Sequence, residues 1–174
     1  KISDDEVIVN VSETQQKQMQ RKVNLYCSIL KKENFELVVQ KAVEVGVNKI
    51  IPITTERTIK QSLKFDRLEK IIKEAAEQCG RATVPVVSEI QSFDDALYAV
   101  SGKENYIFDL SAAEQFSKNN KGTEINLFVG PEGGFSEGEV ELARKAGFKI
   151  TSLGDLVLRG ETAAIVAVWC GVNL

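Results

Sequence analysis

The chain has 174 residues, 43% of them apolar, and a formal net charge of −3, so it is suited to one globular domain and is not a disordered polyelectrolyte. No stretch approaches the roughly 18 apolar residues of a membrane span, and the first residues do not resemble a signal peptide, so a cytoplasmic protein without membrane contact is expected. Histidine is absent, which removes the usual general base and the commonest metal ligand, and no metal site is expected.

The predicted elements alternate between strand and helix along the chain. In the first predicted helix Phe35, Leu37 and Val38 favour the buried side, and Gly46 ends it. Pro85 favours an edge or the start of a strand. Strands are expected at 7–11, 23–30, 48–53, 84–87, 105–110, 125–130 and 147–154, and helices at 31–45, 65–79, 92–100, 136–146 and 160–172. Because a β-α-β order is the unit of parallel sheets, the fold class is α/β with a mostly parallel sheet flanked by helices.

Two glycine-containing segments follow directly after predicted strands, GPEGG at 130–134 and LGDLVLRG at 153–160. In open α/β sheets, ligands bind outside the carboxyl ends of the strands, so both segments are expected at a ligand site. Pro131 fixes one dihedral, and the glycines let the backbone turn sharply and approach a ligand. The plain alternative is a tight turn without a ligand. Neither segment has the spacing of a dinucleotide motif or the Lys-Ser/Thr pair of a P-loop.

Three polar residues, Arg159, Glu161 and Thr162, stand where the second segment meets the apolar last helix. They are candidates for chemistry. Glu161 or Thr162 is also suited to capping the helix, and Arg159 to a structural ion pair.

Charge is distributed unevenly along the chain. Residues 13–81 carry an excess of Lys and Arg, whereas residues 82–174 carry an excess of Asp and Glu. This asymmetry indicates either that a polyanion approaches the first half or that the first half has a solvated charged face.

The two glycine-containing segments also carry a family resemblance. VGPEGGFSEGEVELARKAGF followed by LGDLVLRGETAA resembles the ribosomal RNA small subunit methyltransferase E (RsmE) family, which belongs to the SPOUT class of knotted methyltransferases. Three further blocks match: ELVVQKAVEVGVNKIIPITTERT, KIIKEAAEQCGR and the strand YIFDL. The resemblance runs from about Val23 to the end of the chain.

The resemblance implies methyl transfer from S-adenosyl-L-methionine to N3 of a uridine in 16S ribosomal RNA of the 30S subunit. It implies a C-terminal deep trefoil knot around the cofactor, a homodimer, and no DNA or membrane partner. Arg159 and Glu161 are then the expected catalytic residues. The expected cofactor-binding residues are Leu110, Gly130, Pro131, Glu132, Gly133, Gly134, Leu153, Gly154, Leu156, Leu158 and Thr162, and the expected RNA-binding residues are Lys41, Arg57 and Arg81. The alternatives are a solvated helix face for Lys41, which its pattern favours, and a place in the cleft for Arg81.

The chain also departs from the family pattern. The family usually carries an N-terminal PUA-like β-barrel, of which 1–22 resembles a remnant plus a linker, leaving 23–174 as the SPOUT domain. Gly160 stands where a larger residue such as Thr is common, and Asp155 where Pro or a basic residue is common. Two alternatives remain: a non-catalytic RNA-binding or ribosome-assembly module that keeps the knotted fold, and an enzyme that binds another nucleotide with GPEGG as a phosphate loop.

Overall fold

The computed structural model describes residues 21–59, 62–100, 104–117 and 122–174. The strand expected at 7–11, and with it most of the expected barrel remnant and linker at 1–22, lies outside the described residues. Among these residues, seven strands form one sheet in the order β3-β2-β1-β6-β5-β7, with β4 beside β2, and their pairings are parallel. The strands are β1 (Lys22–Ser28), β2 (Lys49–Thr54), β3 (Val86–Val87), β4 (Gln91–Ser92), β5 (Glu104–Phe108), β6 (Glu124–Val129) and β7 (Lys149–Thr151). The predicted parallel α/β sheet is therefore confirmed.

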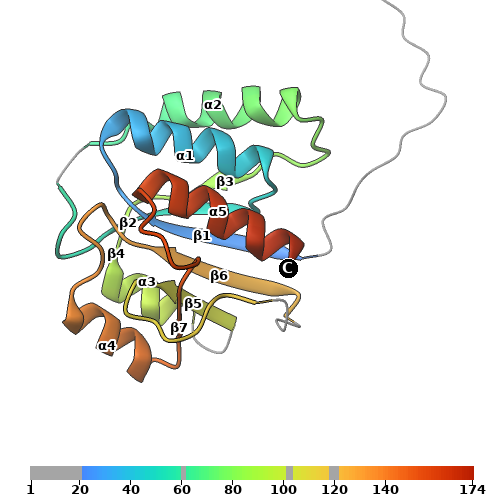
Figure 1. Cartoon of the computed structure of the whole chain (residues 1–174). Coiled ribbons are helices and arrows are strands. Elements are labelled where there is room, and N and C mark those ends of the chain that lie inside the picture. The colour runs from blue at the N-terminus through green and yellow to red at the C-terminus, as the bar shows by residue number, and fades with distance from the viewer. Residues whose placement is uncertain (1–20, 60–61, 101–103, 118–121) are drawn as a thin grey trace, which may run out of the picture.

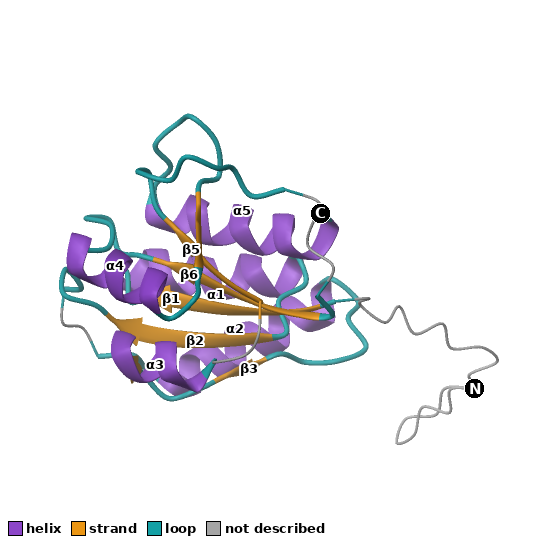
Figure 2. Cartoon of the chain, turned by 90° about the horizontal axis from the view of Figure 1, so that it is seen from below, coloured by secondary structure: helices purple, strands orange, loops and turns teal. Residues whose placement is uncertain are grey.

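Helices cover both faces of the sheet (Figure 1). On one face lie α1 (Lys32–Glu44), α2 (Phe65–Gln78) and α5 (Gly160–Asn173), and on the other α3 (Phe93–Ala99) and α4 (Glu137–Lys145). Figure 2, seen from the side of α3 and α4, shows the strands running side by side between these two layers. Within β1, Leu25 faces the first layer and Tyr26 the second, as expected for alternate residues of a strand buried on both faces.

An asparagine ladder, formed by Asn48, Asn24, Asn126 and Asn105, crosses the middle of the sheet. Asn48 donates to the side chain of Asn24 at 2.8 Å, Asn24 to Asn126 at 3.0 Å, and Asn126 to Asn105 at 2.8 Å. Asn105 donates to the Val100 carbonyl at 3.0 Å. Because Asn24, Asn126 and Asn105 are buried, these bonds supply partners that water would otherwise provide. The ladder joins β1, β6 and β5 in one register.

The order of the strands indicates at which edge of the sheet a ligand is expected to bind. The chain runs outward from β1 to β2 and β3 and then returns, and β6 enters between β1 and β5. The carboxyl ends of β5, β6 and β7 therefore meet at one edge, beside the point where the direction of winding changes. In open α/β folds, ligands bind at such a point.

One local expectation differs from the structure, and one strand pairing was not expected. Leu37 is 40% exposed, because α1 packs with Phe35, Val38 and Val39 toward the core and turns Leu37 outward. The pairing of β4 (Gln91–Ser92) with β2 was not expected, since two residues leave no periodic signal. The edge position expected from Pro85 is confirmed, as β3 ends the sheet order. Among the described residues, none of the helices has the length and apolar character to cross a membrane.

Candidate active site

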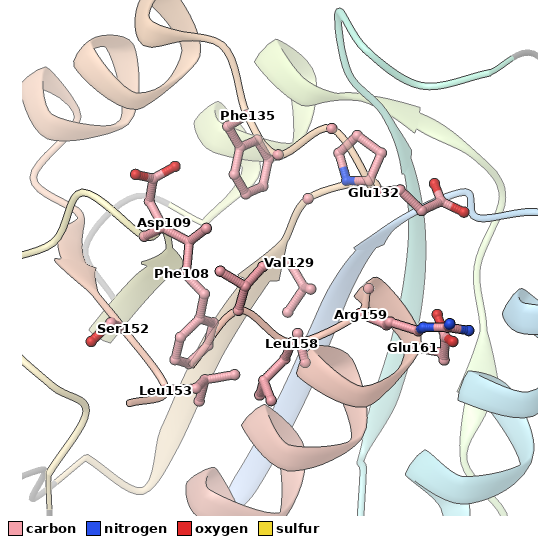
Figure 3. A pocket seen from close by; sticks show the side chains of 18 of the residues that line it. Phe108, Asp109, Val129, Glu132, Phe135, Ser152, Leu153, Leu158, Arg159 and Glu161 are labelled. Carbon is pink, nitrogen blue, oxygen red and sulfur yellow. The ribbon is translucent and has the colours of Figure 1, made fainter. Parts of the chain in front are cut away.

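A cavity of about 660 Å³ lies at the carboxyl edge of the sheet (Figure 3). Its walls come from the end of β5, the end of β6 with the turn that follows it, the loop after β7 and the start of α5. Arg57 after β2 and two residues at the start of α1 complete the lining. This volume is within the range of roughly 300–1,000 Å³ that is usual for small-molecule sites. The expectation that the segments at 130–134 and 153–160 lie together is confirmed, since both line this cavity.

The Gly130–Phe135 turn forms one wall. The amide of Gly134 donates to the Pro131 carbonyl at 2.8 Å, and Gly134 has φ +68°, a conformation that glycine adopts without strain. Phe135 is buried in the core under α3 and α4. Beyond it, Ser136 and Glu139 form a capping box at the start of α4, as the predicted helix start required. The turn is thus anchored at its carboxyl end, while Glu132 and Gly133 are exposed.

The loop 153–158 forms the opposite wall and has few internal contacts. Leu156 and Val157 are 79% and 77% exposed, although both are apolar. Among the hydrogen bonds of the described residues, none uses a backbone group of 153–158. Backbone amides and carbonyls near a cavity need hydrogen-bond partners. Exposed apolar side chains mark a surface that a ligand or another molecule can bury. This loop therefore offers both a flat apolar surface and unpaired polar groups to a ligand.

The two ends of the cavity differ in chemistry, as Figure 3 shows. Phe108 and Val129, the last residues of β5 and β6, are buried and form an apolar floor with Leu153 and Leu158. Glu132, Arg159 and Glu161 lie toward the other end. One end suits an apolar ring, and the other suits a polar or charged group.

Arg159 and Glu161 are brought together by the start of α5. Arg159 occupies the position before the first helical residue, Gly160, and is exposed; none of the ion pairs among the described residues includes it. The suggestion of a structural ion pair is therefore not supported. Glu161 is half-buried and accepts a bond of 3.4 Å from Asn34 Nδ2. Neither Glu161 nor Thr162 caps α5, because the helix starts before them and its first turn has no side-chain cap.

Thr162 does not line the cavity, unlike every other expected cofactor-binding or catalytic residue. It lies in the first turn of α5 with its side chain exposed. The three expected RNA-binding residues do not gather at the cavity, since Lys41 and Arg81 lie at the carboxyl-terminal part of α1. Arg57 lines the cavity, Lys41 pairs with Glu44 at 2.8 Å on α1, and Arg81 donates to the Val43 carbonyl at 2.9 Å.

Burial lowers the pKa of the Arg81 guanidinium from its usual value. Its bond to Val43 satisfies a carboxyl-terminal carbonyl of α1, which is a structural role. Lys41 and Arg81 are thus engaged within the domain and lie outside the cavity lining.

Several cavity residues were not expected from the sequence. Phe108 and Val129 could have been found, because they lie near the carboxyl ends of two predicted strands, at the edge where ligands bind. Lys31 and Asn34 could not, since only the packing of α1 against α5 brings them to the site. Asp109, which follows Phe108, adds a carboxylate to the lining.

The cysteine nearest the cavity floor is not a reactive thiol. Cys27 pairs in register with Val129, is fully buried, and donates to the Ser28 carbonyl. Burial first, and the carboxylate of Glu132 second, raise the pKa of Cys27 to about 12. The thiol therefore stays protonated at neutral pH and is no nucleophile or base.

The two departures from the family pattern have structural explanations. Gly160 is buried, and a Cβ there would lie 3.0 Å from Leu30 Cδ2, so Leu30 fills the space that a larger residue would take. Asp155 accepts a bond of 3.0 Å from Gln115 Nε2, which ties the loop 153–158 to the segment after β5.

Replacing Gly130 with alanine is expected to weaken ligand binding in the cavity by about 10-fold, since overpacking costs roughly 1–3 kcal/mol. The new Cβ would lie 3.1 Å from the Phe135 ring and 3.2 Å from the Gly134 carbonyl carbon, so the turn must shift. The matched control is Gly138→Ala, where the nearest atom is 3.8 Å away and α4 favours alanine. Calorimetry with S-adenosylhomocysteine measures the effect, and equal affinities for the two variants would contradict it.

Comparisons with known proteins agree with this geometry. The RNA methyltransferase domain family matches residues 16–170. The ribosomal RNA small subunit methyltransferase E of Mesomycoplasma hyopneumoniae is 37% identical over 83% of this chain and 66% of its own length. The Bacillus subtilis protein of the same name is 32% identical over 96% of this chain and 72% of its own length.

A solved structure is similar to most of this chain. The crystal structure of a ribosomal RNA small subunit methyltransferase E from Neisseria gonorrhoeae, bound to S-adenosyl methionine, has a TM-score of 0.80 and 34% identity, and the match covers 85% of this chain and 64% of that one. The chain spans 54% to 66% of the length of three of its curated relatives. The parallel sheet, the cavity at its carboxyl edge and these matches together show that the chain belongs to the ribosomal RNA small subunit methyltransferase E family of RNA methyltransferases.

Proposed function

We propose that this chain binds S-adenosyl-L-methionine in the cavity and methylates N3 of a uridine in 16S ribosomal RNA of the small subunit. The observation that carries the proposal is the pairing of the two cavity loops, 130–135 and 153–158, in a chain whose relative from Neisseria gonorrhoeae was solved with S-adenosyl methionine. The relatives are longer than this chain, so the activity and the RNA substrate are part of the proposal.

The residues present fit this cofactor. A planar adenine suits the apolar surfaces of Phe108, Val129 and Leu158, and the unpaired backbone groups of 153–158 suit the edge of a base. The carboxylates of Asp109 and Glu132 suit ribose hydroxyls or a cationic sulfur.

Arg159 and Glu161 would carry the chemistry of the RNA base. Bound S-adenosylmethionine supplies a methyl group on a positively charged sulfur, which needs no further activation. Loss of the N3 proton would leave negative charge on N3 and the carbonyl oxygens of uracil, and the Arg159 guanidinium would stabilise it. Formation of the N3–carbon bond, with cleavage of the sulfur–methyl bond and release of S-adenosylhomocysteine, would then remove this charge. Glu161, held by Asn34, would orient Arg159 or accept the proton. The loops would exclude water and align the reactants.

The finer features of the family are proposed here as well. A trefoil knot is supported by β6 entering between β1 and β5 and by the two loops that line one cavity, and a crystal structure with an unknotted trace over 104–174 would refute it. A homodimer through α5 is supported by Trp169, which is 50% exposed on that helix. Sedimentation equilibrium giving only a monomer would refute the dimer. A domain boundary near residue 22 is supported by the start of β1 at Lys22.

The test of the proposed function uses two measurements. We expect calorimetry to give saturable binding of S-adenosylhomocysteine and none of ATP, and exclusive ATP binding would favour a different nucleotide enzyme. We expect labelled methyl transfer to 30S particles from a strain that lacks the modification. If the protein bound those particles without transferring methyl groups, the non-catalytic module would be favoured instead.

A further inference from the structure

The turn that follows β2, Thr55–Thr58, is a small self-bonded unit. The amide of Thr58 donates to the Thr55 carbonyl at 3.1 Å, and the amide of Thr55 donates to Thr58 Oγ1 at 2.8 Å. The two hydroxyl oxygens also lie 2.8 Å apart. This turn keeps its shape through its own bonds and can therefore serve as a fixed support for its neighbours.

Arg57 connects this support to the cavity. Its Nη1 donates to the Gly133 carbonyl at 2.7 Å and to the Phe135 carbonyl at 3.2 Å. These atoms belong to the Gly130–Phe135 turn, which is 76 to 78 residues further along the chain. Bonds from a guanidinium to carbonyls are charge-assisted and stronger than those between neutral groups.

Glu139 makes a second connection between the same two segments. Its Oε1 accepts the amide of Glu56 at 2.8 Å, and its Oε2 accepts the amide of Ser136 at 2.8 Å. One carboxylate thus holds the Thr55–Thr58 turn and the start of α4 together. The Gly130–Phe135 turn is fixed at its end by Glu139, whereas Gly133 in its exposed middle is held by Arg57.

We propose that Arg57 is a positioning residue for the cofactor, which holds the Gly130–Phe135 turn in its binding conformation, and not primarily a contact to an RNA phosphate. The inference rests on the proposed function of the cavity. Gly133 and Gly134 give this turn more conformational freedom than other residues would. Without the hydrogen bonds from Arg57, the turn would therefore sample many conformations. Holding it before the ligand arrives lowers the entropic cost of binding.

Three variants test the proposal: Arg57→Ala, Arg57→Lys and the control Arg67→Ala. Arg67 is an exposed arginine of α2 that pairs with Glu36, so its loss removes the same charge away from the cavity. We expect about 10-fold weaker binding of S-adenosylhomocysteine for Arg57→Ala, a partial recovery for Arg57→Lys with its single point charge, and no change for the control. The KM for S-adenosylmethionine should rise similarly, with kcat within about 3-fold.

Two further measurements distinguish this positioning role from a contact to RNA and from no role in holding the turn. Hydrogen exchange of the amides at 130–136 requires no cofactor, and Arg57→Ala should speed it up. Binding to 30S particles without cofactor should match that of the control. Unchanged exchange, or weakened 30S binding with unchanged affinity for S-adenosylhomocysteine, would overturn the proposal. If the wild type bound no S-adenosylhomocysteine, the proposed function would fail, while hydrogen exchange would still decide whether Arg57 holds the turn.

Discussion

Replacing Arg159 with alanine is expected to reduce kcat for methyl transfer by about 10²–10³-fold, as removal of one preorganised donor does in other enzymes. Arg159 is exposed at the start of α5 and lies in none of the ion pairs of the described residues, so the fold does not depend on its side chain. We therefore expect the melting temperature and the affinity for S-adenosylhomocysteine to stay near those of the wild type. Single-turnover transfer to unmodified 30S particles measures the chemical step.

The control for this experiment is Arg144→Ala. Arg144 is an exposed arginine of α4 that pairs with Glu141 and lies outside the cavity lining. It should retain wild-type turnover. Wild-type turnover of Arg159→Ala would remove Arg159 from the mechanism, and a loss of turnover explained wholly by lost 30S binding would make it an RNA contact.

The second large effect is expected at the centre of the asparagine ladder. Asn126→Leu should lower the free energy of unfolding by about 3 kcal/mol, because each buried polar group left without a partner costs roughly 1–3 kcal/mol. Asn126 is fully buried, accepts from Asn24 Nδ2 and donates to Asn105 Oδ1, so leucine leaves Asn105 Oδ1 without this donor and takes one acceptor from Asn24 Nδ2. Asn24 keeps its bond to Glu124 at 2.9 Å, which limits the loss.

Urea denaturation measures this loss as a lower midpoint with an unchanged slope. The matched control is Asn48→Ala at the exposed end of the ladder, where water can replace the lost partner, and we expect a loss of about 1 kcal/mol or less. Equal losses for the two variants would show that burial of the ladder does not set its contribution.

The sequence predicted most of the elements but not the order of the strands in the sheet. The strands ending at Phe108 and Val129 were expected from apolar runs, because a strand buried on both faces has a continuous apolar sequence. That β6 lies between β1 and β5 depends on contacts between distant segments, which local periodicity does not record. Thr162 illustrates the limit of a motif: it stands within the matching segment, yet the first turn of α5 leaves it outside the cavity lining.

The candidate site was predictable where it is made of backbone turns and less so where distant side chains meet. The glycines and Pro131 marked one wall, since their residue types reflect backbone shape. Asn34 is 127 residues from Glu161, and no sequence spacing indicates that bond. Arg57 was expected to bind RNA because it follows a strand in the basic half of the chain and matches an arginine of the family, whereas the structure places its Nη1 against two carbonyls of the cavity wall.

The position of β6 has a consequence for how the domain folds. The side-chain bond between Asn24 of β1 and Asn126 of β6 spans 102 residues, whereas the bond between Asn48 and Asn24 spans 24. Closing the longer loop costs more chain entropy and slows the pairing. We expect the β1-α1-β2 half to form early and β6 to join it late. The ligand cavity, whose floor includes the last residue of β6, would then be absent until the sheet is complete, and a partly folded chain could not hold a cofactor.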